Sequence, residues 1–395
     1  MTTHIGIGFS QELNAEKAAR EAAYQAKSNI KADHIDMALI LSTVHYPPNK
    51  TMPVINQMLQ TKNIIGSSTA GIILTDYIKT LGVAILALAS DDIQFGTGSV
   101  NDISSKDPHQ AGTALAHSTV KNFGKLNKQA FLFFIDGQFG KKTPFLKGLQ
   151  DILGNFFPIV GAGSSDDFNF EQSFQIYQGD ALVQSAVGLL MGGRVTVGIG
   201  SRHGWRPLGK PRVIDEVNDN IIVSIDEKKA SSIYVEYFGK DADHIRSSKL
   251  GQLAILYPLG IYVGGGKEYL LRNAIDILAD GSIVCQGDVP NNAEVHIMIG
   301  NKESCKQAAV DAAQEAYKNL GGKHPKLIII LESMTRLKLL GRQAIQEIEK
   351  IKEMFGPSVP IFGMYADGEI YPFQTIDQFK KPHLQNESIT ILAIS

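Results

Sequence analysis

Three short stretches constrain the fold of this chain most, because each runs from apolar residues through a glycine into small polar residues. They are residues 64–71, 159–167 and 361–369. A short buried strand that ends in such a turn leaves backbone N–H groups and small side chains free at its carboxyl end, where open α/β sheets bind ligands. We therefore predict that the three turns form parts of one or two shared sites.

The residues around each glycine follow one order: helix, strand, helix, strand, glycine turn, strand. Asn14 is placed to cap a helix with an alanine-rich face, Asp107 before Pro108 starts a second helix, and Asn301 precedes a third. The sequence thus predicts a mixed α/β (α+β) fold of layered mixed sheets covered by helices, with a repeated α-β-α-β-Gly-turn-β unit. The alternative is coincidence, since helices and strands alternate in many α/β proteins.

A true repeat has a geometric consequence. Gly66, Gly161 and Gly363 should lie at equivalent strand ends, and the three units should superpose as α/β layers. We expect the third unit to open with a strand at 295–299.

Turn residues predict three hairpins, which join strands 81–89 with 93–98, 213–217 with 221–225, and 275–278 with 282–285. A short helix at 230–238 is followed by the polar stretch 239–249, where we expect a domain boundary. The predicted domains are 1–240, containing two units and a hairpin extension, and 250–395.

Composition excludes several classes of protein. An apolar fraction of 44% rules out a disordered chain, and 395 residues suggest two or three domains. The formal net charge is −2 and no basic block occurs, so we expect no nucleic-acid partner. Cys285 and Cys305 match no disulfide framework or metal motif. No export signal or membrane-spanning run is visible, so we expect a cytoplasmic protein without membrane insertion.

The familiar enzyme and cofactor motifs are incomplete or missing. The stretch 161–163 begins like a dinucleotide fingerprint, but the third glycine is missing and no helix is expected after it. No phosphate-binding loop, nucleophile elbow or zinc-protease helix occurs. We therefore expect no cofactor, no metal site and no catalytic residues.

Several polar residues are candidates for ligand contact, each with a structural alternative. Asp166 and Asp167 could hold a cation or a ligand amine, or they could cap the turn. Arg272 could clamp a carboxylate or pair with a structural acid. Trp205, the single tryptophan, could floor a pocket or pack in a core. Asp367-Gly368 alone would be an ordinary hairpin turn, but Glu369 directly after it is harder to explain as a solvent-exposed surface residue.

Polar residues also follow the second strand of each unit. Asp136 and Glu332 stand where Ser42 and Thr43 stand in the first unit. We favour helix capping for Ser42 and Thr43, and ligand contact for Glu332.

In these stretches the chain resembles the FIST domain, a sensory module with parts called FIST N and FIST C. The resemblance covers nearly the whole chain and is carried by residues 66–71, 160–167, 204–209, 225–226, 257–260, 269–272, 280–282 and 363–370. One departure is the segment 331–336, where the family often has Ser-Cys and this chain has no cysteine. A thiol function at that place is therefore not expected.

The resemblance implies a sensor of small ligands, with amino acids the usual suggestion. Relatives in bacteria and archaea are often joined to signalling output domains, and a eukaryotic relative carries an F-box. FIST-like sequence fills this chain, so we expect it to signal to a partner protein in trans or simply to bind its ligand. Two alternatives stay open: an enzyme acting on a small amino or carboxylic compound, and an interaction scaffold without a small ligand.

The predicted ligand-binding residues are expected to approach one cleft between the two parts. In this prediction Arg272 holds the carboxylate of a zwitterionic amino acid, and Asp367 or Glu369 holds its ammonium group. The full set is Ser67, Ser68, Thr69, Gly161, Ser164, Ser165, Asp166, Asp167, Trp205, Arg272, Tyr365, Asp367 and Glu369.

Overall fold

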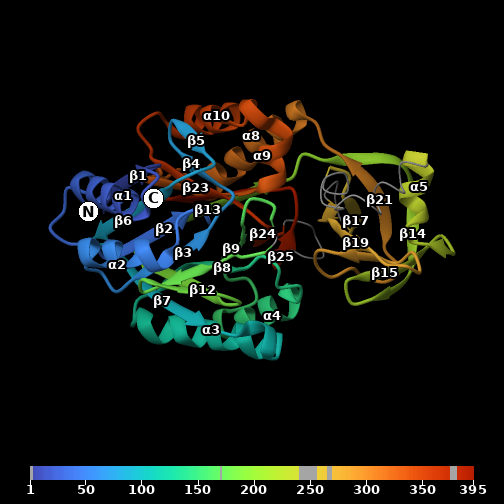
Figure 1. Cartoon of the computed structure of the whole chain (residues 1–395), viewed down its shortest axis with the longest axis horizontal. Helices are drawn as coiled ribbons and strands as arrows, with labels where there is room; N and C mark the ends of the chain where they lie inside the picture. The colour runs from blue at the N-terminus through green and yellow to red at the C-terminus, as the bar shows by residue number, and fades with distance from the viewer. Residues whose placement is uncertain (1–2, 170, 240–255, 265–268, 374–379) are drawn as a thin grey trace.

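The computed structural model describes residues 3–169, 171–239, 256–264, 269–373 and 380–395 (Figure 1). The molecule has a large lobe of three six-stranded sheets and a smaller lobe with one eight-stranded sheet. Both chain ends lie in the large lobe, and residues 206–299 supply the eight-stranded sheet. The fold class is therefore mixed α and β with layered sheets, as predicted.

The large lobe consists of three repeats with one order of elements. The first repeat contains β1 (Thr3–Ser10), α1 (Ala15–Asn29), β2 (Met37–Ser42), α2 (Pro48–Leu59), β3 (Ile64–Ser68), the hairpin β4 (Gly71–Leu74) and β5 (Tyr77–Lys79), and β6 (Val83–Ser90). The second contains β7 (Ile93–Val100), a 3-10 turn (Ile103–Ser105), α3 (Pro108–Phe123), β8 (Lys128–Asp136), α4 (Lys142–Leu153), β9 (Ile159–Ser164), the hairpin β10 (Gln175–Tyr177) and β11 (Asp180–Leu182), and β12 (Ala186–Gly193).

The third repeat has the same order but is interrupted after its first strand. It contains β13 (Val197–Arg202), α8 (Lys302–Asn319), β22 (Leu327–Ser333), α9 (Met334–Leu340), a 3-10 turn (Gly341–Gln343), α10 (Ile345–Phe355), β23 (Ile361–Ala366), the hairpin β24 (Glu369–Pro372) and β25 (Pro382–Gln385), and β26 (Ile389–Ile394). The smaller lobe is thus inserted between β13 and α8.

Each sheet of the large lobe is completed by a hairpin from another repeat. The hairpin β4–β5 pairs with β23, β10–β11 pairs with β3, and β24–β25 pairs with β9. The inner faces of the three sheets share one core, in which Leu39, Leu132 and Ile329 are each at most 1% exposed. This cyclic exchange makes each sheet depend on a strand pair that another repeat supplies.

The three predicted glycines occupy equivalent register positions. Gly66 lies between Ile40 and Ile176, and the same pairing places Gly161 between Phe133 and Ile370, and Gly363 between Ile330 and Ile73. The prediction that they lie at strand ends is wrong, because each is the third residue of its strand. A Cβ at Gly66 would lie 2.2 Å from the carbonyl oxygen of Ile40, so crowding by the neighbouring strand, rather than a turn, requires glycine.

Small residues bring the helices close to the sheets. The alanines of α1 are buried against β1, where a Cβ on Gly8 would lie 1.9 Å from the carbonyl oxygen of Ala22. The predicted caps are confirmed, since Asn14, Asp107 and Asn301 each accept a backbone N–H of the first turn of their helices. Alanine and glycine thus shorten the distance between layers at the expense of side-chain volume.

The smaller lobe is largely one antiparallel sheet. It contains β14 (Arg206–Asn218), β15 (Ile221–Ile225), β16 (Lys228–Lys229), α5 (Ser232–Phe238), β17 (Leu259–Tyr262), β18 (Tyr269–Arg272), β19 (Ala274–Ile277), β20 (Ile283–Cys285) and β21 (Glu294–Ile299) (Figure 1, right). The predicted hairpins β14–β15 and β19–β20 are confirmed, with Asp219 and Gly281 at positive φ in the turns.

Two strand predictions are wrong. The strands β6 and β7 do not form a hairpin: β6 pairs with β1 and β2, whereas β7 pairs with β12 in the next sheet. The strand near 295–299 is β21 of the inserted sheet, and β13 opens the third repeat. Which strands pair thus depends on contacts between distant segments, which local turn residues do not determine.

In sequence, the predicted boundary near 240–250 lies between strands that pair in the inserted sheet. Strands before it, such as β14, pair with strands after it, such as β21, and β13 pairs with β26. Residues 240–255 lie outside the described residues. The division into 1–240 and 250–395 stays a prediction. In both lobes, strands from before this boundary pair with strands from after it.

Candidate functional site

A cavity of about 540 Å³ lies where the second repeat, the third repeat and the smaller lobe meet. The large lobe lines it with residues after β8, after β9, at the start of α9 and in the β23–β24 turn, and the smaller lobe with residues of β14–β15 and β19–β20. The lining residues are Gly137, Gln138, Gly140, Lys142, Phe168, Asn169, Asn220, Asn273, Ala274, Ile275, Cys285, Gln286, Gly287, Ser333, Met334, Thr335, Lys338, Ala366, Asp367 and Gly368. This volume is in the range of small-molecule sites, roughly 300–1,000 Å³.

Asp367 is held at the wall of this cavity by close backbone packing. Its N–H donates to the carbonyl of Gly163 at 3.0 Å, and a Cβ on Gly163 would lie 2.1 Å from the carbonyl oxygen of Asp367. A Cβ on Gly137 would lie 2.9 Å from its Oδ2. Gln286 of the smaller lobe donates to its Oδ1 at 2.7 Å. Burial raises the pKa of Asp367, whereas Lys142 and Gln286 favour the ionised form.

Lys142, which the sequence did not single out, is the buried cation of the cavity. It is the first residue of α4, and its Nζ donates to the carbonyls of Gly137 at 2.7 Å and Phe139 at 2.8 Å. Burial lowers the pKa of Lys142, while Asp367 and Asp136 oppose that shift. A buried lysine and a buried aspartate with pKa values shifted toward each other are typical of functional sites.

The turn after β9 places an aromatic ring among the lining residues in a strained backbone conformation. Asp167 and Phe168 have φ angles of 58° and 63°, in the left-handed region that side chains with a Cβ rarely adopt. The exposed Lys338 of α9 has its Nζ 5.0 Å from the centre of the Phe168 ring. Such strain persists only where the surrounding structure holds it, and it is concentrated at binding sites.

Most of the predicted serine and threonine residues join the repeats to one another. The backbone carbonyl of Tyr365 accepts the hydroxyls of Thr69 at 2.9 Å and Ser165 at 2.7 Å. The hydroxyls of Ser67 and Ser164 lie 2.7 Å apart. These contacts bring turns of all three repeats together in the interior of the large lobe, where the hydroxyls are buried.

Other predicted residues also have partners away from the cavity. The hydroxyl of Ser68 accepts the N–H of Phe174 at 3.1 Å, and the Asp166 carboxylate accepts the N–H of Glu171 at 2.6 Å, as a turn cap would. The fully buried Glu369 accepts the hydroxyl of Ser388 at 2.7 Å. Trp205 packs in a cluster with Leu271, Met298, Cys305, Leu340 and Ala344.

Arg272 connects the two lobes through backbone carbonyls. Its Nε donates to Asp288 at 2.8 Å, and its Nη1 donates to Leu271 at 2.9 Å and to Leu384 of β25 at 3.0 Å. Burial lowers the pKa of Arg272 to about 10. Of the thirteen predicted residues, Asp367 lines the described cavity and Arg272 does not.

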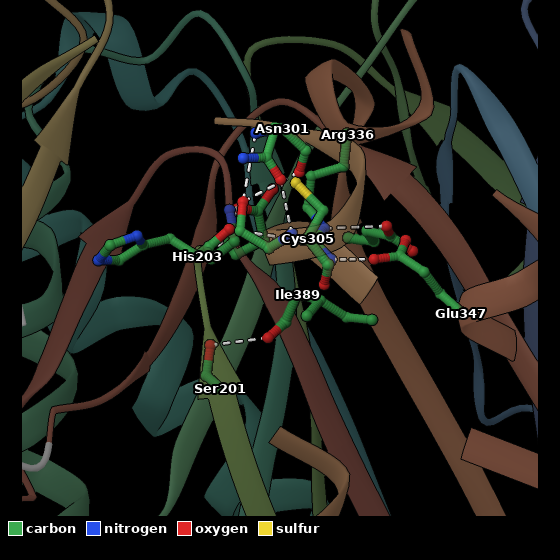
Figure 2. Close-up of polar contacts among 11 residues, drawn as sticks. Ser201, His203, Asn301, Cys305, Arg336, Glu347 and Ile389 are labelled. Atoms are coloured by element: carbon green, nitrogen blue, oxygen red, sulfur yellow. Dashed lines mark hydrogen bonds and ion pairs between the residues drawn. The ribbon is translucent and has the colours of Figure 1, made fainter. Parts of the chain in front are cut away.

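A second buried cation, Arg336 of α9, lies at the point where the smaller lobe is inserted (Figure 2). Its Nε donates to Glu332 at 3.0 Å, its Nη1 to the carbonyl of His203 at 2.8 Å, and its Nη2 to the carbonyl of Cys305 at 2.9 Å and to Glu347. Glu332, predicted to contact ligand, is thus one of its two carboxylate partners. Burial and Glu347 raise the pKa of Glu332, and burial also lowers that of His203 to about 3.

In residues 3–169, 171–239, 256–264, 269–373 and 380–395, no group of three histidine, cysteine or carboxylate side chains could hold a metal ion, and no helix is long and apolar enough to cross a membrane. Burial raises the pKa of Cys285 to about 12, which disfavours a reactive thiolate at the cavity.

Sequence reasoning missed most of the cavity because its lining comes from separated segments. Asn273, Gln286 and Thr335 follow no motif that brings them together. Lys142 carried a weak signal, since it starts a helix shortly after the Asp136-Gly137 turn.

The family models of the FIST N domain and the FIST C domain match residues 36–228 and 230–372. An uncharacterised protein of Methanocaldococcus jannaschii is 28% identical over 191 residues, which are 46% of this chain and 36% of that protein. This chain therefore matches about a third of that relative.

Among solved structures, a cyanuric acid hydrolase from A. caulinodans is 7% identical over 100% of this chain and 99% of its own, with a TM-score of 0.40. PurLQS from Thermotoga maritima is 10% identical over 99% of this chain and 72% of its own, with a TM-score of 0.22. Likenesses at this level carry no argument about this chain.

Proposed function

We propose that this chain, which belongs to the FIST family of sensory proteins, binds a small ligand in the cavity between its lobes and signals to a partner protein in trans. The observation that carries the proposal is the meeting of Asp367, Lys142 and Gln286 at this cavity. The large lobe contributes the first two residues and the smaller lobe the third. A ligand there contacts both lobes.

An amino acid-like ligand fits the charges of this cavity. In this proposal Asp367 accepts the ammonium group, and the exposed Lys338 among the lining residues meets the carboxylate. We assign the carboxylate to Lys338 rather than Arg272, since Arg272 is occupied by three carbonyls outside the lining. The signal in this proposal is a change in how firmly the ligand holds the lobes together, which a partner reads.

The test is a thermal-shift screen of amino acids with a variant that fills the cavity. Ile275 lines the cavity and is 53% exposed, so Ile275→Trp should occupy the cavity without disturbing a core. Val213→Trp, at a residue that is 49% exposed in the same sheet and is not a lining residue, is the matched control. A ligand at a hundred times its Kd should stabilise the native protein by about 2.7 kcal/mol. Equal stabilisation of the Ile275 variant would contradict the proposal.

An enzyme acting on a small amino or carboxylic compound is the second candidate. The observation that favours it is the opposite displacement of the Lys142 and Asp367 pKa values within one cavity, which is how acid and base pairs are set. Mass spectrometry of any compound that binds, after incubation with the wild type and with Lys142→Met, decides between the two. Product formed by the wild type alone would favour the enzyme.

A further inference from the structure

We propose that the inner end of this cavity is a subsite for a protonated nitrogen group, an ammonium or a guanidinium ion, and that Glu387 releases a proton when such a group binds. This inference rests on the proposed function of the cavity as a ligand site. It adds the charge of the ligand group that reaches Asp367 and Asn273, and a proton that leaves in exchange.

One hydrogen-bond acceptor at this end of the cavity lacks a donor. Asn273 lines the cavity and is 8% exposed, yet its Oδ1 has no hydrogen-bond partner in the described part of the chain. Glu387 is fully buried and is not a lining residue, but its carboxyl group lies next to two lining residues, Asn273 and Thr335. A buried acceptor without a donor is costly, so the Asn273 oxygen favours a guest that brings N–H groups.

The donors nearest to Asp367 and Asn273 largely have acceptors already. Two N–H groups of Lys142 go to the carbonyls of Gly137 and Phe139. The amide of Gln286 donates to Asp367, and the amide of Asn273 donates to the Gln286 oxygen at 3.3 Å. An anionic group would add further acceptors beside carboxylates, whereas an ammonium or guanidinium group would supply three or more donors.

The charges around Glu387 explain why a proton is held until a cation arrives. Burial raises the pKa of Glu387 to about 8, and Asp367 adds to that shift, while Asn273, Thr335 and Arg336 oppose it. The buried Glu369 of β24 and the Cys305 thiol of α8 also face it. With the cavity empty, Glu387 is therefore mostly neutral at pH 7. A cation beside Asn273 and Asp367 favours the carboxylate and lowers this pKa.

The second repeat shows that the acid is not required by the backbone. The carbonyls of Ser185 and Ser388 accept the N–H groups of Asp136 and Ser333 at equivalent strand ends. The preceding residues, Gln184 and Glu387, have φ angles of 46° and 61°. A glutamine thus adopts the same backbone as Glu387, so Glu387→Gln should fold and keep the shape of the site.

The experiment uses n-butylammonium and methylguanidinium as cation probes and butyrate as the anion probe. Isothermal titration calorimetry at pH 7 in two buffers with different ionisation enthalpies measures affinity and proton release together. The cations should bind the wild type and release about 0.9 proton, since a group with pKa near 8 becomes ionised in the complex. Butyrate, titrated in the same way, should not bind this subsite.

Variants of the full chain separate the role of Glu387 in proton release from the role of Asp367 in cation binding. Glu387→Gln and Asp367→Asn should each weaken cation binding about ten- to a hundredfold, because each removes a charged partner. Glu387→Gln should also abolish proton release, and Asp367→Asn should not. Glu349→Gln, at an exposed position of α10, is the matched control and should change neither quantity.

Three results would overturn the inference: butyrate binding where the cations do not, cation binding without proton release, or release that persists in Glu387→Gln. If neutral or anionic compounds bind the wild type and Ile275→Trp blocks them, the cavity is a ligand site and only the cation subsite is wrong. If no compound distinguishes Ile275→Trp from Val213→Trp, the proposed function fails as well.

Discussion

Two buried cations of this protein, Arg336 and Lys142, lie near carboxylates, but their surroundings differ. Around Arg336, Glu332 and Glu347 accept directly from the guanidinium, and two backbone carbonyls take its other N–H groups. Around Lys142, two carbonyls accept from the ammonium, and Asp367 is held by Gln286 instead. The three charged side chains of the first assembly are all 0% exposed, whereas the second borders a cavity of about 540 Å³.

The difference separates a structural polar network from a ligand site. The guanidinium of Arg336 connects β13, α8, β22 and α10 at the point where the smaller lobe is inserted. The cavity leaves the Oδ1 of Asn273 unpaired between two lobes that a ligand could bridge. Helix α9 takes part in both, since Arg336 faces the network while Thr335 and Lys338 line the cavity. Burial and charge alone therefore do not distinguish the two.

The largest effect is expected from removing the Arg336 guanidinium from its buried network. Arg336→Met should lower the free energy of unfolding by about 3–5 kcal/mol, because Glu332 and Glu347 lose their buried cation. Chemical denaturation measures this loss, and Arg342→Met, at an exposed arginine, is the control. A loss below about 1 kcal/mol, the usual size for exposed ion pairs, would show that the network is not structural.

The lobe contact at Arg272 should show the next largest effect. Arg272→Gln should cost about 3 kcal/mol of stability, since buried carbonyls of Asp288 and Leu384 lose charged donors. Asp367→Asn should cost less and weaken ligand binding instead. Melting temperature and affinity measured for both variants test this contrast. A stable Arg272 variant that fails to bind ligand would show that Arg272 contacts the ligand after all.

Glu387 should make stability depend on pH in a defined direction. Its pKa is raised from 4.5 to about 8, so between these values the unfolded carboxyl is ionised while the folded one keeps its proton. Wild-type stability should fall relative to Glu387→Gln as pH rises through this window, by up to about 1.4 kcal/mol per pH unit. Between pH 5 and pH 7 the wild type should lose about 2–3 kcal/mol of stability relative to Glu387→Gln, which chemical denaturation at the two pH values measures. Parallel pH profiles would show that Glu387 is ionised in the empty protein.

The smallest effect is expected at an exposed ion pair. Lys147 and Asp151 of α4 lie 2.6 Å apart with side chains 56% and 39% exposed. Lys147→Ala should leave stability almost unchanged, because water and salt screen such pairs. The same denaturation assay measures it. A change comparable to that of Arg336→Met would show that burial is not what separates strong ion pairs from weak ones in this protein.

Local features of the structure could be predicted well from the sequence. The caps at Asn14, Asp107 and Asn301, the alanine face of α1 and two of three hairpins depend on neighbouring residues alone. The site could be predicted less well, with Asp367 as the shared residue. Gln286 and Thr335 reach the cavity from segments far apart in the chain, so no local pattern marks them.

The sequence by itself determined the elements and their repetition, because capping, turn geometry and apolar spacing act over a few residues. Only the tertiary structure decided which strands pair, so that β6 and β7, adjacent in sequence, belong to different sheets and each hairpin completes the sheet of another repeat. It also decided which buried charges pair with one another and which border a cavity. The physical reason is that pairing and burial depend on surfaces from distant segments, whose fit is established only when the whole chain packs.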